Sequence, residues 1–392
     1  MKIGFDVSQT GKLKAGCGYF ADSLIRHLAE IDSENNYILY PTFGDLYWDS
    51  DWRSGIGQIH RPNFKWGLAH KTFAAAKFFW QHLPANFEIR LGNPDIIHSN
   101  NFYCPVGVRK AKVIYTLYDL SFLIYPEWTT EQNRTGCFNG VFNASLYADF
   151  IFSISRYSRK HFLEIFPHYP ADRIVVVHPG SRFIGPREIS KPKKLSILQP
   201  DKFWLNVGVI EPRKNHQGLL QAYALLKGSL GKTLPLVLAG GRGWLMDDFE
   251  EKLEALNLRQ DVILLDYVDD ETLRWLYQNC FAFIFPSLFE GFGLPVLEAM
   301  SLGAPVIASH VSSIPEIVGQ AGVLINPTNE EALSQAMHKI ATNPGFRVDL
   351  KKKALQQASQ FSWKSTASTA LQCYRDVLSR DPIFSGTSSG RT

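Results

Sequence analysis

The stretch FAFIFPSLFEGFGLPVLEAM, residues 281–300, decides the fold of this chain. It begins with a short apolar run, Ala282 to Phe285, which predicts a buried strand. Gly291 and Gly293 then let the backbone turn tightly, and Pro295 is typical of the first turn of a helix. A buried strand followed by a glycine turn and a helix is the unit from which parallel α/β sheets are built.

The same stretch predicts a binding site. Glu290 follows the strand, and seven residues separate it from Glu298, which falls about one turn into the helix. The helix opens with four main-chain amides, those of Gly291, Phe292, Gly293 and Leu294. Amides at a helix N-terminus favour phosphate, and carboxylates accept hydrogen bonds from sugar hydroxyls. The pattern fits a nucleotide sugar; the alternative is a charged strand end and a glutamate on a helix surface.

Length and composition set limits on the class of protein. The chain has 392 residues, which predicts two domains. Its formal net charge of +4 is too small for a strongly basic nucleic-acid binder. The five cysteines form no CxxC pair and no Cys/His cluster, so neither a zinc site nor a disulfide framework is expected, and a reducing compartment is favoured. The N-terminal run predicts a strand and not a signal peptide, and no apolar run is long enough to span a bilayer.

Strands and helices alternate twice along the chain, which predicts two domains with parallel sheets. In the first half, strands are expected at 3–7, 37–41, 96–98, 113–117, 150–154 and 174–177. In the second half they are expected at 203–207, 234–239, 262–265, 282–285, 306–308 and 322–325. The first domain is therefore 1–185 and the second 202–360. Prolines and charges without periodicity predict a linker at 186–201, and residues 381–392 are expected to be a loose tail.

A basic turn follows the first strand of the second domain. Arg213 and Lys214 lie after Gly208 and Pro212, at the carboxyl end of that strand. Two adjacent cations there would neutralise a diphosphate, and they would stabilise the charge that grows when a nucleoside diphosphate leaves a sugar. The alternative is a solvated basic turn.

Several segments together resemble one family. The run EGFGLPVLEAMSLGAPVIAS (290–309) looks like the sugar-donor site of retaining glycosyltransferases of family 4, which have the GT-B fold. Further segments resemble other motifs of that family: VGVIEPRKN (207–215), SSIPEIV (312–318), AGVLINP (321–327), PDIIHS (94–99) and TLYDLSF (116–122). The resemblance implies two Rossmann-like domains with a cleft between them and a C-terminal helix, 365–379, that packs back on the first domain. It also implies transfer with retention, in which the acceptor hydroxyl attacks from the face that the diphosphate leaves.

The resemblance also implies roles for individual residues. Lys214 matches a family lysine, whereas Val209 stands where the family often has an arginine, so Arg213 would supply the guanidinium. Main-chain groups near Val268 would hold the base. In the first domain the implied residues are a glycine pair that approaches the diphosphate, Gly16 and Gly18, and two cleft residues, Tyr118 and Asp119. Tyr118 stands where many members have a histidine, and a tyrosine does not titrate near neutral pH.

The expected substrates follow from this assignment. The Glu-Pro-Arg-Lys-Asn variant looks most like mannosyl-type members, which makes GDP-mannose the first expectation and UDP-glucose the next. The acceptor would be a hydroxyl of a glycan or a lipid-linked glycan, and no cofactor is expected. Asp49 and Asp51 spell DxD in an aromatic run, which we interpret as a loop and not as a metal site. With helix amides, Arg213 and Lys214 available, no metal is needed.

Basic and aromatic residues interleave in one part of the first domain. The basic residues are Lys65, Lys71, Lys77, Arg90, Arg109, Lys110 and Lys112, and the aromatic residues are Trp66, Phe73, Phe78, Phe79 and Trp80. One interpretation is a surface for anionic lipid-linked glycans. The other is an amphipathic helix whose aromatic side chains lie in the core. The expected location is the cytoplasm, with association at the inner membrane face as a hypothesis.

Three other function classes remain open on the sequence. A GT-B sugar-nucleotide epimerase would use the same sugar-donor site without a second sugar. A non-catalytic subunit would bind the nucleotide sugar and show no turnover. An NAD(P)-linked oxidoreductase is disfavoured, because Gly16-Cys17-Gly18 is not a full GxGxxG and no fitting acidic residue follows.

Overall fold

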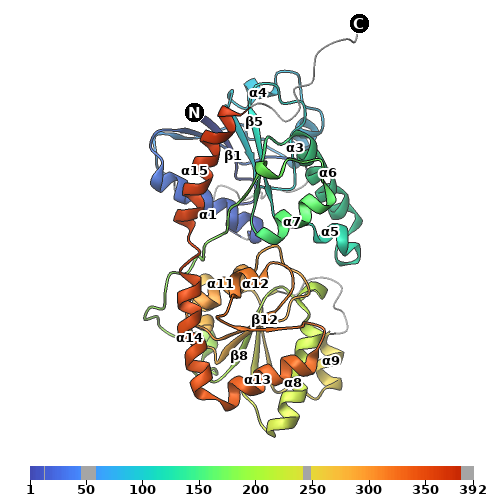
Figure 1. Cartoon of the computed structure of the whole chain (residues 1–392), viewed down its shortest axis with the longest axis vertical. Coiled ribbons are helices and arrows are strands. Elements are labelled where there is room, and N and C mark those ends of the chain that lie inside the picture. The colour runs from blue at the N-terminus through green and yellow to red at the C-terminus, as the bar shows by residue number, and fades with distance from the viewer. Residues whose placement is uncertain (13, 46–58, 242–248, 381–392) are drawn as a thin grey trace. The chain divides into compact units, whose positions relative to one another are not determined.

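The computed structural model describes residues 1–12, 14–45, 59–241 and 249–380. The predicted DxD pair and the predicted tail lie outside these ranges. The chain folds as two compact units. Unit 1 comprises Met1–Pro179 together with Ser362–Thr392, and unit 2 comprises Gly180–Phe361. Figure 1 shows a sheet with helices around it in each unit.

Unit 1 contains a seven-stranded parallel sheet in the order β3-β2-β1-β4-β5-β6-β7. Its strands are β1 (Lys2–Asp6), β2 (Asn36–Tyr40), β3 (Phe64–Trp66), β4 (Ile96–Ser99), β5 (Lys112–Leu117), β6 (Phe150–Ser153) and β7 (Ile174–Val176). Its helices are α1 (Gly16–Ile31), α3 (Phe73–Gln81), α4 (Phe87–Arg90), α5 (Ser121–Ile124), α6 (Glu131–Tyr147), α7 (Arg156–Ile165) and α15 (Trp363–Ser379). The part of unit 1 that the structure describes also contains two 3-10 turns, η1 (Pro126–Trp128) and η2 (Ala171–Arg173).

Helix α15 is joined to unit 1 by side chains from far along the sequence. It packs beside α1, as Figure 1 shows in red and blue. The Tyr374 hydroxyl of α15 lies 2.6 Å from Nδ1 of His98 in β4, and the Trp363 ring packs edge-on against Phe20 of α1. His98 is fully buried, and burial lowers its pKa to about 3. His98 is therefore a packed core residue.

Unit 2 contains a six-stranded parallel sheet in the order β10-β9-β8-β11-β12-β13. Its strands are β8 (Trp204–Val207), β9 (Leu236–Ala239), β10 (Val262–Leu265), β11 (Ala282–Phe285), β12 (Val306–Ser309) and β13 (Val323–Ile325). Its helices are α8 (His216–Leu230), α9 (Phe249–Ala255), α10 (Asp270–Asn279), α11 (Leu294–Ser301), α12 (Ile314–Val318), α13 (Glu330–Thr342) and α14 (Pro344–Ala358). Outside residues 242–248, unit 2 also contains two 3-10 turns, η3 (Lys193–Leu195) and η4 (Pro212–Lys214).

The strand order of unit 2 fixes where a ligand can bind. Strand β8 pairs with β9 on one side and with β11 on the other, so the chain reverses its direction of winding between β8 and β11. Open parallel sheets bind ligands beyond the carboxyl ends of the strands at such a reversal. The turn η4 follows β8, and the loop that carries Glu290 follows β11. Both predicted binding segments of unit 2 therefore leave the sheet at its reversal point.

The strands expected from the sequence agree with the observed ones to within two residues, and the α/β class is confirmed. Strand β3 was not expected, because its sequence, Phe-Lys-Trp, is not an apolar run like those of the expected strands. Residues 186–201 belong to unit 2. There the Arg187 amide donates to Gln278, and the Gln278 side chain donates back to the Arg187 carbonyl at 2.7 Å. Composition marked this segment as irregular but could not show that it packs against α10.

Candidate functional site

The turn η4 is held in place by Asn215. This residue has a left-handed backbone with φ of 55°, which an asparagine tolerates. Its side-chain oxygen accepts from the Gly218 amide and so caps α8. Its side-chain nitrogen donates to the carbonyls of Pro327 at 2.6 Å and Pro286 at 3.2 Å. One side chain therefore fixes the end of η4 against the segments that follow β11 and β13.

Glu290 binds both cations of that turn. Its Oε1 lies 2.6 Å from Nζ of Lys214, and its Oε2 lies 2.8 Å from Nη1 of Arg213. The second terminal nitrogen of the guanidinium group, Nη2, lies 2.7 Å from Oε1 of Glu211. The structure thus brings together three residues that the sequence analysis selected and adds Glu211, which it did not. Two carboxylates and two cations make this cluster neutral overall.

The cluster is buried, and its electrostatics reflect that. Glu290 is 6% exposed and Lys214 is 9% exposed. Burial by itself would raise the pKa of Glu290, but Arg213 and Lys214 lower it overall, so the carboxyl stays ionised. The pKa of Lys214 is lowered by burial and by Arg213, against the opposing effect of Glu290. A diphosphate that reaches these cations would replace a carboxylate with a more highly charged partner.

Two serines shape the backbone around Glu290. The Glu290 amide donates to the Ser312 hydroxyl at 2.9 Å. The Ser313 hydroxyl lies within 2.8 Å of the carbonyls of both Glu290 and Phe292. Both serines belong to the segment 312–318 that carried part of the family resemblance. Their sequence position gave no reason to expect these contacts.

Gly293 permits the entry into α11. Its φ is +113°, and a Cβ placed there would lie 2.6 Å from the Ile314 side chain. The helix starts at Leu294 with Pro295 in its first turn, and no side chain caps it. The predicted strand, glycine turn and proline-initiated helix are all present.

Glu298 is held by an arginine that the sequence analysis missed. The carboxylate is 3% exposed, and Arg182 binds it with both Nε, at 2.6 Å, and Nη2, at 3.2 Å. The Tyr277 hydroxyl adds a third contact at 3.3 Å, and Arg182 also pairs with Asp270. Arg182 lies 116 positions before Glu298 and outside every motif, so no local pattern could have found it.

Val268, which was expected to lie near the base, is half-buried and lies in the segment between β10 and α10.

The predicted residues of unit 1 lie around the carboxyl ends of β1 and β5. Gly16 begins α1, and Gly18 follows it in the first turn. A Cβ at Gly18 would lie 2.0 Å from the Gln9 carbonyl, so this position requires glycine, whereas Gly16 faces open space. The Tyr118 hydroxyl donates to the Asn100 carbonyl at 2.7 Å. Asp119 accepts from the amide and the hydroxyl of Ser121.

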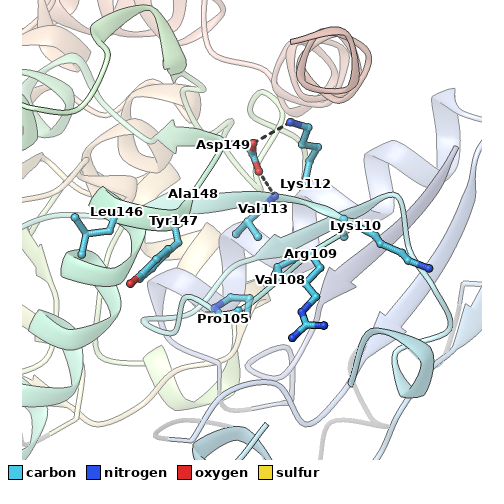
Figure 2. Close-up of a pocket in the computed structure, with 12 residues that line it drawn as sticks. Pro105, Val108, Arg109, Lys110, Lys112, Val113, Leu146, Tyr147, Ala148 and Asp149 are labelled. Atoms are coloured by element: carbon cyan, nitrogen blue, oxygen red, sulfur yellow. Dashed lines mark hydrogen bonds and ion pairs between the residues drawn. The ribbon is translucent and has the colours of Figure 1, made fainter. Parts of the chain in front are cut away.

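A pocket in unit 1 lies apart from these residues. Figure 2 shows it beside the start of β5 and the end of α6, and none of its lining residues is a predicted site residue. Lys112 is paired there with Asp149 at 3.1 Å. The side chains of Arg109 and Lys110 extend away from that pair. Two of the basic residues noted in the sequence therefore form an exposed rim on this pocket.

Two general features of the described ranges complete the description. Within them, no three His, Cys, Asp or Glu side chains converge into a group that could hold a metal ion. Of the helices that these ranges contain, none combines the length and the apolar character that crossing a bilayer requires.

Comparison with known proteins connects this geometry to a family. Residues 188–357 match the family described as "Glycosyl transferases group 1". The chain is 36% identical over 287 residues to O-antigen chain mannosyltransferase B of Escherichia coli, covering 71% of this chain and 74% of that protein. It is 35% identical over 240 residues to the serotype-specific mannosyltransferase WbdA of Escherichia coli, covering 59% of this chain and 29% of WbdA.

Solved structures show the same fold at low identity. The structure of Anabaena Alr3699/HepE in complex with UDP-glucose has a TM-score of 0.73 at 18% identity, covering 96% of this chain and all of that one. WaaG, a glycosyltransferase involved in lipopolysaccharide biosynthesis, has a TM-score of 0.67 at 17% identity, covering 94% of this chain and 98% of that one. These neighbours confirm the expected GT-B architecture. Together with the sequence match to the mannosyltransferase, they establish that the chain is a glycosyltransferase that belongs to the group 1 glycosyl transferases.

Proposed function

We propose that the chain is a retaining, metal-independent mannosyltransferase. It would take mannose from GDP-mannose and transfer it to a hydroxyl of a glycan or a lipid-linked glycan. The names of the mannosyltransferases that it resembles support the sugar. The observation that carries the mechanism is the cluster in which Glu290 bridges Arg213 and Lys214 at the reversal point of the unit 2 sheet.

The cluster suggests how the sugar donor is bound. The diphosphate would lie against the amides of residues 291–294 and attract Arg213 and Lys214 away from Glu290. The carboxylate of Glu290 would then be available to accept hydrogen bonds from hydroxyls of the transferred sugar. Glu298, held in orientation by Arg182 and Tyr277, would accept from the ribose hydroxyls with its remaining lone pairs.

The reaction itself exchanges one bond for another. The bond between the anomeric carbon and the diphosphate oxygen breaks, and the acceptor oxygen bonds to the same carbon from the same face. The acceptor proton passes to the departing phosphate oxygen. Negative charge grows on the diphosphate, where Arg213 and Lys214 stabilise it more than they stabilise the bound sugar donor.

Incubation with sugar donor and acceptor tests this proposal. We expect GDP-mannose to raise the melting temperature more than UDP- or ADP-sugars do, because a ligand of the native state stabilises it. With an α-mannoside acceptor we expect an α-linked product by NMR, at the same rate with and without EDTA. A β-linked product, or activity lost in EDTA and restored by a divalent cation, would contradict the mechanism. Consumption of GDP-mannose at an equal rate without acceptor would favour the epimerase.

We further propose that unit 1 contacts an anionic membrane surface. In α3 the Phe79 and Trp80 side chains are buried, which supports the core interpretation for them, but Phe73 and Phe78 are 45% and 68% exposed. Exposed Trp66 lies in β3, and Lys65 and Lys71 nearby in the sequence are also exposed. Exposed aromatic and basic side chains together favour an interface with anionic lipid.

Vesicle flotation measures this association. We expect the protein to float with phosphatidylglycerol vesicles and not with phosphatidylcholine vesicles, and we expect Phe78→Ser to reduce the bound fraction severalfold. Phe138→Ser, on the exposed side of α6, is the matched control. Equal recovery of the protein with both lipids, or equal binding by Phe78→Ser and wild type, would rule out this surface as the membrane contact.

A further inference from the structure

Unit 1 contains a second hollow, which is lined largely by residues with polar side chains and has no assigned role. It has a volume of about 710 Å³ and lies between α3, the loop after β4, and α6. This size falls within the range of ligand pockets, roughly 300–1,000 Å³. The side chains that matter for its chemistry are Lys77, Gln81, Phe102, Gln132, Asn139 and Asn143. We call this hollow the amide groove.

Helix α6 turns a row of amide side chains toward the groove. Gln132, Asn139 and Asn143 lie seven and four positions apart, so the 3.6-residue period places them along one face. The buried face of the same helix carries Cys137 and Val141. No hydrogen bond joins the three amide groups to other side chains or main-chain groups of the described ranges. Each amide offers donors and an acceptor to whatever fills the groove.

The floor of the groove is built by a close approach of two backbones. A Cβ at Gly140 of α6 would lie 1.9 Å from the Phe102 carbonyl, so glycine is required where the loop after β4 crosses the helix. The loop is also fixed by Tyr103, whose hydroxyl donates to the Trp80 carbonyl at 2.8 Å. Phe102 remains half-buried and is one of the residues that line the groove. An aromatic ring on a rigid floor can pack against the apolar face of a sugar ring.

Phe102 also connects the groove to the predicted reaction region of unit 1. Its ring centroid lies 5.8 Å from that of Tyr118. Tyr118 in turn contacts the carbonyl of Cys17, between the two glycines predicted to approach the diphosphate. The groove, which extends along α6, is therefore separated from Tyr118 by a single residue, Phe102. An acceptor chain lying in it would have one end near Tyr118.

The charge of the groove favours a neutral glycan over an anionic ligand. Two acidic side chains, Asp45 and Glu131, line it together with one cation, Lys77. The pocket of Figure 2 differs, because Arg109, Lys110 and Lys112 lie there against a single acid, Asp149. A slightly acidic groove rich in amides repels phosphate groups and suits uncharged hydroxyls.

We propose that the amide groove binds a run of neutral sugar residues of the acceptor glycan, with Gln132, Asn139 and Asn143 donating to and accepting from their hydroxyls. The role of that glycan as acceptor rests on the proposed function, whereas its binding does not. The groove would make a longer glycan a better acceptor than a short one, because more of its hydroxyls reach the three amides.

The test compares acceptor lengths in one variant and one control. The variant is Gln132→Ala/Asn139→Ala/Asn143→Ala, and alanine favours the helix, so α6 should keep its fold. The control is Gln356→Ala, an exposed amide on α14 of unit 2. The acceptors are α-linked manno-oligosaccharides of one to six residues with GDP-mannose. For wild type and control we expect KM to fall at least tenfold with length, and for the variant we expect KM to be independent of length.

Two further measurements distinguish a failure of the groove proposal from a failure of the proposed function. The KM for GDP-mannose and kcat on the monosaccharide should be unchanged in the variant, and melting curves check its fold. Saturation-transfer NMR with mannohexaose measures glycan binding without turnover, and we expect its signal only where the three amides are present. Transfer by wild type without any length dependence, or equal mannohexaose binding by the variant, would overturn the groove. Glycan binding without transfer from any sugar nucleotide would instead retain the groove and reject the proposed function.

Discussion

At Glu290, burial and neighbouring charge act in opposite directions on one carboxyl group. Desolvation disfavours its ionised form, and the two cations at 2.8 Å or less favour it by more. Removing Glu290 would take from the buried Lys214 the carboxylate that it binds, which costs far more than the loss of an exposed pair would. The cluster that we propose to bind the diphosphate is therefore also a point at which substitutions should affect stability.

Loss of Lys214 should weaken transfer without unfolding the protein. In Lys214→Ala, Glu290 keeps Arg213 as its partner, but the leaving diphosphate loses one cation. We expect kcat/KM to fall at least about tenfold, which is ~1.4 kcal/mol of transition-state stabilisation. Lys352→Ala, an exposed lysine on α14, is the matched control. A folded Lys214→Ala enzyme with wild-type kinetics would contradict the assigned role.

Loss of Arg182 should affect stability as well as binding. Arg182→Ala leaves the 3%-exposed carboxylate of Glu298 with only Tyr277. We expect the free energy of unfolding to decrease by about 1–3 kcal/mol, because a buried acceptor loses its main hydrogen-bond partner. Thermal melting measures the change, and Arg259→Ala, which removes an exposed pair with Glu250, is the control. Equal melting temperatures for both variants would show that the Arg182 pair contributes no more than a surface pair.

At the scale of elements, turn geometry explains why the decisive stretch folds as it does. Gly293 must be glycine for two independent reasons, its positive φ and its approach to Ile314. We expect Gly293→Ala to destabilise the protein by about 1–3 kcal/mol. In contrast, Gly228→Ala in α8 meets nothing within 4 Å and should stabilise slightly. Thermal melting of the two variants, with shifts of opposite sign, checks this.

The sequence was most informative where chemistry and backbone path depend on neighbouring residues. Gly293, Pro295 and the apolar run 282–285 each act locally, so the strand, turn and helix could be predicted. Lys214 and Glu290 were selected separately, from their places at strand ends. Their direct contact follows from the pairing of β8 with β11, which brings together residues 76 positions apart.

Other features depend on packing that no local pattern encodes. Arg182 reaches Glu298 because the segment after β7 returns to α11, and its surroundings in the sequence carry no motif. The partners of Tyr118 could not be foreseen either, since its hydroxyl meets a carbonyl from the loop after β4. The amide side chains of α6 could not be predicted to share a binding face, because the helix sequence has no apolar stripe that would distinguish a buried face from an exposed one.

At the scale of the whole molecule, buried titratable groups couple stability to pH. Burial raises the pKa of Asp6, at the end of β1, from 3.8 to about 7, although hydrogen bonds from Ser8 and Asn100 oppose the shift. Between those values the folded state holds a proton that the unfolded state has released. The contribution of Asp6 to the free energy of unfolding is therefore present at low pH and is lost as pH rises to about 7.

Asp6→Asn should remove that dependence. Because asparagine does not titrate, the melting temperature of the variant minus that of wild type should increase from pH 4.5 to pH 7.5. The comparison cancels titrations that both proteins share, including that of His98. A difference that stays constant over this range would show that Asp6 is ionised in the folded protein throughout it.

The central claim is that Arg213 and Lys214 exchange Glu290 for the diphosphate of the sugar donor. Calorimetric titration of GDP into wild type and into Lys214→Ala tests it most directly, with melting curves to confirm that both proteins are folded. We predict at least tenfold weaker binding of GDP by the variant and little change in its binding of guanosine, which has no phosphate. Equal GDP affinity for the two proteins would contradict the account.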